Sequence, residues 1–450
     1  MSERSLVRAS ELLAGRRASA TELLDDALGA IDRFENLVHA WATVDHEGAR
    51  AAATAADERT ARGERRSALD GVPLGIKDLI DTAGIRTTYG SPLFADHVPT
   101  RDAHVVATLR RAGAVIVGKT VSTEFATFDP PATRNPWNLA HTPGGSSSGS
   151  AAAVASAMVP GAVGSQTGGS TIRPASYCGV VGYMPSPGWA GRSGVYPCSW
   201  SLDRVGLFGT SVGDVSLLLD GCLGEDRADP ISRSVRREPS SPALPHSAVV
   251  LSSLVVQAMP AMRRAVQSVA DLLVGAGTRV ESVASDDIGV AHAAHMTVMR
   301  AEIASVHADQ YARHPDGYGP RITEMIESGR RVSAGDYLRA LRYRARFRRE
   351  FADTNQGFEV LLAPAAVGAA EASHDTVGEP LMNLLATFAG LPAISIPVAL
   401  DESGLPLGVQ LIGAQDGDER LLAIAAAIEE RLGFRRPQLP MVRTEAPSPD

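Results

Sequence analysis

Cysteine is scarce in this sequence, and the scarcity excludes two common ways of stabilising a protein. Only three cysteines occur in 450 residues: Cys178, Cys198 and Cys222. An odd number without any C-x-x-C spacing provides neither a disulfide framework nor a zinc site. The N-terminal residues also lack the apolar core of a secretory signal peptide. We therefore expect a soluble cytosolic protein that holds no metal.

Long hydrophobic runs and an excess of positive charge are absent as well. No window approaches the ~20 apolar residues that a transmembrane helix needs. The formal net charge of −8 disfavours nucleic acids and anionic membranes as partners, because both bind cationic surfaces. The arginine-rich stretch 342–349 is interpreted as a solvated helix face. With 44% apolar and 21% charged residues, the chain has the composition of an ordinary globular enzyme.

Hydrophobic periodicity predicts alternating helices and strands, which favours a mixed sheet flanked by helices in one large α/β/α domain. Helices are expected at 5–32 (as two), 49–62, 104–112, 151–158, 259–276 and 419–432, with further helical segments up to about 354. Strands are expected at 72–76, 114–118, 248–256, 360–363, 393–398 and 407–412, the last two side by side.

Composition also suggests how this single domain, 1–450, is organised. The charged, Pro/Ser-rich segment 224–247 predicts an exposed connection between a catalytic front half, 1–223, and a back half, 248–440. Residues 290–350 are expected to cover the entrance of the cleft, and the Gly/Pro-rich stretch 171–209 to form loops over it. The last residues, 441–450, are expected to be a flexible tail.

Two glycine–serine clusters, 144–150 and 164–170, bracket the Ala-rich segment 151–158. Flexible linkers do not enclose so apolar a helix, so both clusters are interpreted as ordered turns. Ordered glycine turns expose backbone N–H groups that can bind a negatively charged oxygen. Ser170, which follows two glycines, is then either a nucleophile or merely the cap of a short helix.

A serine nucleophile needs a base, because its hydroxyl is barely nucleophilic at neutral pH. Lys77 directly follows the apolar run 72–76, which carries it toward the interior, and burial there would lower its pKa enough to make it a base. An ion pair with Asp78 or another carboxylate is at least as good an interpretation of Lys77. Among the histidines, His141 is nearest to the first cluster and is the other candidate base.

These features occur together, and in the same order, in one enzyme family: the sequence resembles the amidase signature family over nearly its whole length. The segments that carry the resemblance are GVPLGIKD (71–78), GKT (118–120), NPWN (135–138), TPGGSSSGS (142–150), TGGS (167–170), PASYCG (174–179), SLD (201–203), GLPAISIP (390–397) and GVQLIG (408–413).

The resemblance implies a serine–serine–lysine triad and an acyl-enzyme mechanism without metal or organic cofactor. Ser170 matches the nucleophile, Lys77 the general base, and Ser146, after a cis peptide bond from Gly145, the bridging serine. Backbone N–H groups of the turn 167–170 would form the oxyanion hole. Its four residues are Thr167, Gly168, Gly169 and Ser170.

Four departures from the family pattern concern the surroundings of this triad. Gln166 stands where many members carry aspartate, and Met184 where lysine is common. Arg173 follows the nucleophile by three residues, whereas the commoner pattern has arginine two after it. The segment 121–124 replaces a commoner version that contains asparagine. None of these departures removes a triad residue.

The substrate pocket is inferred from aromatic residues near the clusters, which would favour a small apolar or aryl acyl group. Its candidate residues are Phe125, Phe128, Gly144, Gly145, Tyr196, Cys198 and Trp200. The aromatic ones could equally be ordinary core and loop packing. We expect a small-molecule amide or carbamate as substrate and a monomer or homodimer as the working form.

Other functions stay open at this point. Carbamates and esters would react by the same attack. The family also contains the glutaminase subunit of a tRNA-dependent amidotransferase, which requires a partner chain. Outside the enzymes, the glycine-rich turns could bind phosphate or nucleotide. However, neither turn has the G-x-x-x-x-G-K-[ST] or the G-x-G-x-x-G pattern.

Overall fold

The computed structural model describes residues 5–238, 240–284, 288–434 and 439, so the expected tail at 441–450 lies outside the described residues. The described chain forms one sheet with strand order β1-β3-β2-β4-β6-β5-β10-β11-β9-β7-β8. Its strands are β1 (Trp41–Val44), β2 (Pro73–Lys77), β3 (Val115–Thr120), β4 (Gly161–Gln166), β5 (Val181–Met184), β6 (Arg204–Gly209), β7 (Ser247–Leu251), β8 (Arg279–Val283), β9 (Val360–Pro364), β10 (Ala393–Leu400) and β11 (Pro406–Ile412).

The sheet is mixed, as predicted. β2 runs parallel to β3 and β4, and β7 runs parallel to β8 and β9, whereas the other neighbours are antiparallel. β10 and β11 pair with Ile394 opposite Leu411, which confirms that they lie side by side. β5, from the front half of the sequence, pairs with β10, from the back half. The sheet is therefore continuous across the segment 224–247.

Helices pack against this sheet, which confirms the α/β class. They are α1 (Leu6–Ala14), α2 (Ala20–Val38), α3 (His46–Arg62), α4 (His104–Ala112), α5 (Ser148–Ala155), α6 (Ile172–Cys178), α7 (Val212–Cys222), α8 (Ser252–Val255), α9 (Pro260–Gly275), α10 (Ile288–Val306), α11 (Ala308–Arg313), α12 (Pro320–Arg330), α13 (Ala334–Thr354), α14 (Leu384–Ala389) and α15 (Asp418–Leu432). Short 3-10 turns occur at Pro92–Phe94, Glu124–Ala126 and Pro315–Gly317. No helix among the described residues is long and apolar enough to cross a membrane.

Helix α5 is buried over its whole length, because Ala, Ser, Gly and Val give it a thin cross-section. Its closest approach is at Gly149. A Cβ there would lie 2.2 Å from the Ala40 carbonyl oxygen and 2.3 Å from the Val121 nitrogen. Only glycine fits this contact, and the contact fixes how deep the start of α5 lies. The helix ends at Ala155, three residues earlier than predicted.

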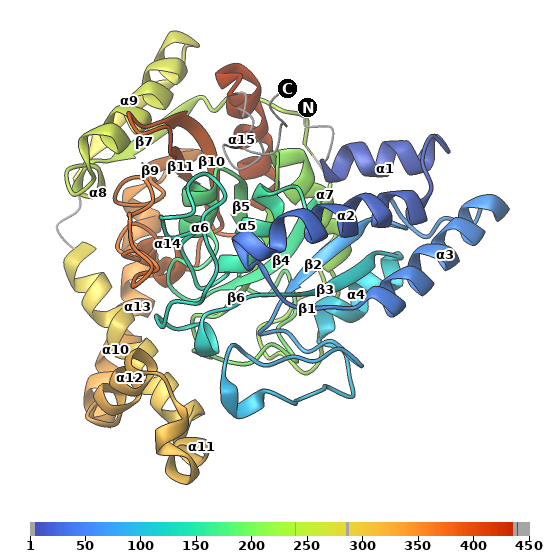
Figure 1. Cartoon of the computed structure of the whole chain (residues 1–450). Helices are drawn as coiled ribbons and strands as arrows, with labels where there is room; N and C mark the ends of the chain where they lie inside the picture. The colour runs from blue at the N-terminus through green and yellow to red at the C-terminus, as the bar shows by residue number, and fades with distance from the viewer. Residues whose placement is uncertain (1–4, 239, 285–287, 435–438, 440–450) are drawn as a thin grey trace, which may run out of the picture.

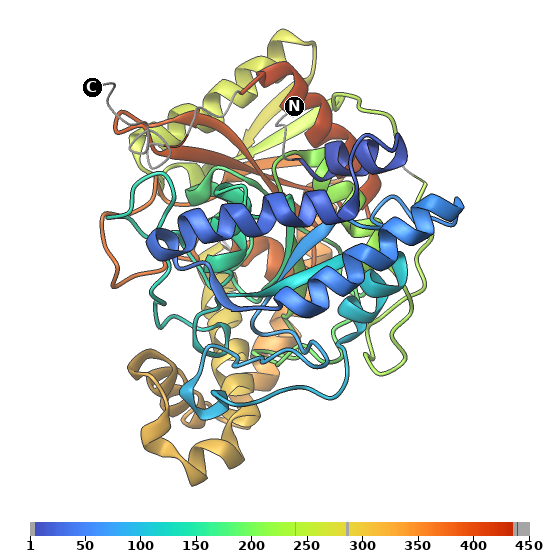
Figure 2. The same cartoon turned by 45° about the vertical axis from the view of Figure 1, so that its right-hand side comes forward.

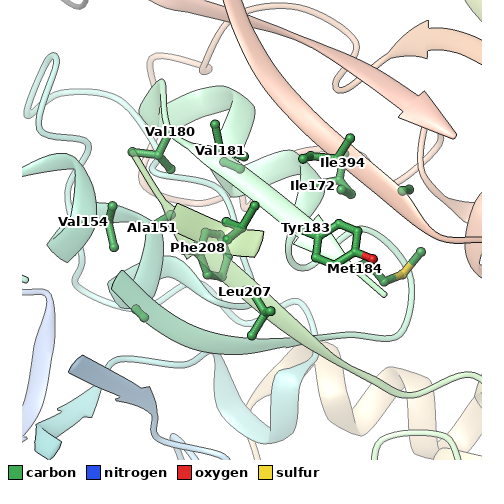
Figure 3. Close-up of a cluster of buried hydrophobic side chains, with 14 of the residues drawn as sticks. Ala151, Val154, Ile172, Val180, Val181, Tyr183, Met184, Leu207, Phe208 and Ile394 are labelled. Atoms are coloured by element: carbon green, nitrogen blue, oxygen red, sulfur yellow. The ribbon is translucent and has the colours of Figure 1, made fainter. Parts of the chain in front are cut away.

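The core beneath α5 and α6 joins both helices to the centre of the sheet (Figure 3). Val154 and Ile172 come from these helices, and Val181, Phe208 and Ile394 come from three strands. All five are at most 1% exposed. Because the two glycine–serine turns lie at the ends of elements anchored in this core, the core holds the turns in place.

Several predicted elements are wrong in extent or type. The stretch 171–209 is not only loops, since it contains α6, β5 and β6. The predicted strand 248–256 ends at Leu251 and continues as α8, and β8 was missed within a region predicted helical. β8 lies at the edge of the sheet with an exposed pattern, so its sequence lacks the apolar alternation of a buried strand.

The connection 224–247 is mostly exposed, but it also carries buried carboxylates. Asp229 forms an ion pair with Arg192 at 2.7 Å, and Asp226 accepts a hydrogen bond from the Ser193 N–H at 2.9 Å. The connection thereby holds the loop that follows β5. Sequence reasoning missed this role because the segment reads as charged and solvated.

Helices α10 to α13 form a lobe that projects from the sheet in both views (Figures 1 and 2). α10 packs against α12, α13 and α14. Glu302 of α10 accepts hydrogen bonds from the hydroxyls of Ser201, at 2.5 Å, and Tyr337, at 2.6 Å. The lobe is therefore tied to the loop ahead of β6, which borders the site described next.

Candidate active site

Two neighbouring parallel strands bring the candidate residues to one edge of the sheet. β2 ends at Lys77 and β4 ends at Gln166, with Ile76 paired to Val163. The region beyond the carboxyl ends of parallel strands is where open α/β sheets hold their ligands. The turns that precede α5 and follow β4 both reach this edge.

Lys77 is fully buried and hydrogen-bonded to two serines. Its Nζ lies 2.7 Å from Ser146 Oγ and 2.8 Å from Ser165 Oγ. Burial lowers the pKa of Lys77 to about 7, because the charged amine loses its hydration, although the Asp203 carboxylate opposes the change. A neutral amine that can accept a proton is therefore available near neutral pH.

The alternative reading of Lys77, an ion pair with Asp78, is wrong. Asp78 accepts a hydrogen bond from the Thr88 N–H at 3.0 Å, and no ion pair joins it to Lys77 in the described part of the chain. The second hydrogen-bond acceptor of Lys77, Ser165, was missed by sequence reasoning. The only feature that could have indicated Ser165 is its position five residues before Ser170, on the strand that leads to the Gly-Gly turn.

Ser146 lies in the serine turn, residues 144–148, which leads into α5. The Gly145–Ser146 peptide bond is cis, as the resemblance implies. Gly144 has a φ of 77°, a conformation that favours glycine. The Ser148 hydroxyl donates to the Gly144 carbonyl oxygen at 2.6 Å and closes the turn. This turn presents Ser146 to Lys77.

Ser170 lies at the end of the Gly-Gly turn, residues 167–170, just ahead of α6. The Ser147 N–H donates to the Ser170 carbonyl oxygen at 3.4 Å, which brings the two turns together. The Ser170 Oγ makes no hydrogen bond to any described residue, so the expected link between Ser170 and Ser146 is not formed here. Hydrogen bonds of this kind often tighten only when substrate binds.

The Gly-Gly turn offers free backbone donors beside Ser170. The N–H groups of Gly168, Gly169 and Ser170 have no acceptor among the residues that the structure describes. The carbonyl oxygen of Gly168, in contrast, accepts from the Thr387 hydroxyl at 3.1 Å. Consecutive free N–H groups next to a serine hydroxyl are the arrangement that stabilises an oxyanion.

A buried carboxylate holds the start of this turn. Thr167 Oγ1 donates to Asp203 Oδ1 at 2.5 Å, and Asp203 also accepts from the backbone N–H groups of Cys198 and Ser199. Burial raises the pKa of Asp203 to about 6, and the bond from Thr167 acts against that rise. Asp203 belongs to the SLD segment of the resemblance, but sequence reasoning gave it no role.

Two residues that depart from the family pattern, Gln166 and Met184, contact each other. Gln166 Oε1 accepts from the N–H groups of Thr171 and Ile172, so a neutral amide caps α6. Its Nε2 lies 3.1 Å from Met184 Sδ and 3.2 Å from Thr387 Oγ1. The amide and the methionine are thus neighbours, and neither adds charge to the Gly-Gly turn.

The third departure, Arg173, links the two turns. Its Nη2 donates to the Gly145 carbonyl oxygen at 2.7 Å, directly ahead of the cis bond. Its Nε and Nη1 are buried and have no partner among the described residues. Burial lowers the pKa of Arg173 to about 10, so the guanidinium stays charged at neutral pH.

A narrow cavity of about 10 Å³ opens beside Ser170; we call it the Ser170 cavity. Two methionines of α10, Met296 and Met299, form part of its wall. Phe128 is the one predicted aromatic pocket residue that lines it. The full lining is Ala126, Thr127, Phe128, Gly168, Gly169, Ser170, Arg173, Met296, Met299, Pro380 and Leu384.

The other predicted aromatic residues lie elsewhere. Phe125 is fully buried and packs on Tyr196 and His307, with ring centroids 5.1 and 4.6 Å apart. Tyr196 and Trp200 line a different cavity, of about 230 Å³, which is also lined by Ser165.

Cys198 and the alternative base His141 do not line the Ser170 cavity either. Cys198 is buried, and burial raises the pKa of its thiol, so the thiol is inert. The Nδ1 of His141 has no hydrogen-bond partner among the described residues. No hydrogen bond joins His141 to Lys77, Ser146 or Ser170 in that part of the chain. Within it, moreover, no group of three or more His, Cys, Asp or Glu side chains could hold a metal ion.

Known proteins resemble this chain over nearly its full length. The model of the Amidase family matches residues 22–422. A glutamyl-tRNA(Gln) amidotransferase subunit from Desulforapulum autotrophicum is 34% identical over 95% of this chain and 97% of its own length. The corresponding protein from Synechococcus sp. (strain CC9311) is 36% identical over 93% of this chain and 96% of its own length.

Solved structures agree with these sequence relatives. A chain from a vestigial protein complex, described as revealing the evolutionary origins of an s-triazine catabolic enzyme, has 32% identity and a TM-score of 0.90, covering 96% of this chain and 99% of that one. The peptide amidase of Stenotrophomonas maltophilia has 26% identity and a TM-score of 0.84, covering 98% and 99%. The chain is therefore a member of the amidase signature family and an enzyme that acts on amide C–N bonds.

Proposed function

We propose that the protein is an amidohydrolase that works through an acyl-enzyme on Ser170, with Ser146 as proton relay and Lys77 as general base. The observation that carries the proposal is the 2.7 Å contact between Lys77 Nζ and Ser146 Oγ, made by a buried lysine whose pKa is lowered to about 7. The free N–H groups of Gly168, Gly169 and Ser170 support it as the oxyanion site.

The reaction begins with proton transfer. Neutral Lys77 accepts a proton from Ser146, which takes one from Ser170 as the Ser170 oxygen attacks the amide carbonyl carbon. The oxyanion that forms is held by the Gly-Gly turn. The proton returns through Ser146 to the leaving amine, the C–N bond breaks, and water then hydrolyses the acyl-enzyme by the same relay. The relay supplies the base and the N–H groups of the turn stabilise the oxyanion, so the mechanism calls on no metal or organic cofactor.

The first test is product release from a panel of amides, carbamates and esters, with chelator present. Wild type and Ser170→Ala are compared, and the matched control is Ser156→Ala, since Ser156 bonds to the Ala152 carbonyl oxygen beyond the far end of α5. We expect activity in the wild type and in the control, and none in Ser170→Ala. Equal activity in Ser170→Ala would refute Ser170 as the nucleophile.

A second candidate follows from the names of the relatives. Several are subunits of glutamyl-tRNA(Gln) amidotransferase, so this chain could be a glutaminase component that acts with a partner chain. Hydrolysis of L-glutamine by the isolated chain, or only after addition of a partner protein, would support this candidate. Efficient cleavage of other amides by the isolated chain would favour the simple amidohydrolase.

A further inference from the structure

Arg173 is a buried cation without a counter-ion next to the proposed nucleophile. Its side chain is only 2% exposed, and two of its three nitrogens, Nε and Nη1, have no partner among the described residues. The nearest carboxylates that act on it, Glu371 and Glu379, are both exposed, and neither forms an ion pair with it within the described ranges. A buried charge without a counter-ion is strongly unfavourable unless a bound ligand supplies the opposite charge.

The unpaired part of the guanidinium faces the site. Arg173 and Ser170 line the same cavity, and the Arg173 N–H donates to the Gly169 carbonyl oxygen at 3.0 Å, so one tight turn separates them. Nη1 lies close to the Gly-Gly turn, because a Cβ on Gly169 would be 3.2 Å from it. An anionic group on the substrate would therefore reach Arg173 while the carbonyl carbon lies at Ser170.

The surroundings supply no charge of their own to neutralise Arg173. Gln166, at the start of the Gly-Gly turn, is a neutral amide already engaged in capping α6. Apart from the hydroxyls of Thr127 and Ser170, the rest of the cavity is apolar side chains or glycine backbone, with Phe128, Met296 and Met299 among its walls. Such apolar walls suit the methylene groups between the two ends of a substrate.

We propose that Arg173 binds a carboxylate on the acyl part of the substrate, so that the preferred substrates are monoamides of short dicarboxylic acids. The proposal rests on the proposed function, because it assigns a substrate class to the same site. It replaces the expectation of a neutral apolar or aryl acyl group. Guanidinium–carboxylate hydrogen bonds are charge-assisted and stronger than neutral ones, which makes this the dominant contact available to a small acyl group.

The same geometry disfavours an amino acid as substrate. The residues that line the Ser170 cavity in the described structure include no aspartate or glutamate, so an α-ammonium group would be buried there without a partner. Glutaramate is glutamine without its amino group. We therefore expect glutaramate to be the better substrate of the two, which separates this proposal from the glutaminase reading.

The test compares charged amides with neutral ones of the same shape. Values of kcat/KM are measured for succinamate and glutaramate, and for 4-methylpentanamide and 5-methylhexanamide, in which an isopropyl group replaces the carboxylate. We expect the wild type to prefer each charged amide by at least about 100-fold, since a site built for a polar group rejects analogues that lack it. Equal or better cleavage of the neutral amides would overturn the proposal.

Two variants separate binding from a merely structural role. Arg173→Met keeps the length of the side chain but loses the charge, and Arg173→Lys keeps the charge. If Arg173 binds the carboxylate, Arg173→Met loses at least about 100-fold more in kcat/KM for the charged amides than for the neutral ones, mainly through KM, and Arg173→Lys recovers part of that difference. If Arg173 only holds the Gly145 carbonyl, both variants lose activity on all four amides alike, and the proposal fails.

A binding measurement covers the case in which Arg173 variants do not fold. Succinate and glutarate are titrated into Ser170→Ala and followed by thermal shift and calorimetry, with 4-methylpentanoate as a control of single charge. Stabilisation by the dicarboxylates beyond the control supports the site, and its absence refutes it. Dicarboxylate binding without hydrolysis of any amide by the wild type would refute the proposed function but not the Arg173 site. Hydrolysis of neutral amides without dicarboxylate binding would sink only the Arg173 proposal.

Discussion

Lys77 and Ser165 are 2.8 Å apart, so the buried lysine is hydrogen-bonded to a serine on its own sheet as well as to Ser146 in the turn above. Two hydroxyl acceptors direct the amine and stabilise its protonated form in an environment that otherwise opposes charge. The two serines hold the amine in place and favour its protonated form, whereas burial favours its neutral form. The first two predictions test these opposing effects on the pKa of Lys77.

The pH dependence of catalysis should report the pKa of Lys77. The base must be neutral, so kcat/KM is expected to rise with pH through an apparent pKa of about 7 and then to level off. Lys77→Ala should lose at least about 1,000-fold in kcat/KM. The matched control is His141→Ala, which should keep nearly full activity and the same profile. Loss of the rising limb in His141→Ala, with retention of activity in Lys77→Ala, would reverse the assignment of the base.

Ser165→Ala should shift that profile toward lower pH. Removing one acceptor destabilises the protonated amine, so the pKa of Lys77 falls further and the rising limb moves to lower pH. We also expect kcat to fall by about 10-fold, because the amine is less well directed at Ser146. The measurement is a full pH profile of kcat/KM beside the wild type. An unchanged profile would show that Ser165 does not tune the base.

Asp203→Asn should weaken the oxyanion site without altering substrate binding. Asp203 accepts the Thr167 hydroxyl and two backbone N–H groups, and an amide cannot accept all three as well as a carboxylate. The Gly-Gly turn then becomes less ordered, so kcat is expected to fall by about 10- to 100-fold with little change in KM. Steady-state kinetics on one good substrate measures both. A rise in KM at constant kcat would contradict a positioning role.

Gly149→Ala should destabilise the fold strongly. Its new Cβ would meet backbone atoms of Ala40 and Val121, which cannot move aside as a flexible side chain can. We expect a loss of about 3 kcal/mol in the free energy of unfolding. The matched control is Gly29→Ala within α2, where nothing lies within 4 Å, and which should gain up to about 1 kcal/mol. Denaturant unfolding of both variants checks the pair, and similar stabilities would refute the close contact.

The sequence predicted β2, β3, β7, β9, β10 and β11, but it did not predict β1, β4, β5, β6 or β8. Helix 104–112 and strands near 72–76 and 360–363 were found because their patterns are strong and buried. β8 was missed because an exposed edge strand carries no apolar alternation. Phe125 and Tyr196 were assigned to the pocket because an aromatic residue near a motif looks the same in sequence whether it lines a cavity or packs in a core.

What the sequence by itself determined is local chemistry: a lysine at the end of an apolar strand, serines and glycines in two turns, and the cis bond that the family resemblance implied at Gly145–Ser146. What only the tertiary structure decided is which groups are left without partners. The unpaired edge of Arg173, the free N–H groups of the Gly-Gly turn and the methionines of α10 come from segments far apart in the chain. Whether each of these polar groups finds a hydrogen-bond partner is decided only when those segments pack together. Substrate preference is therefore a property of the folded chain.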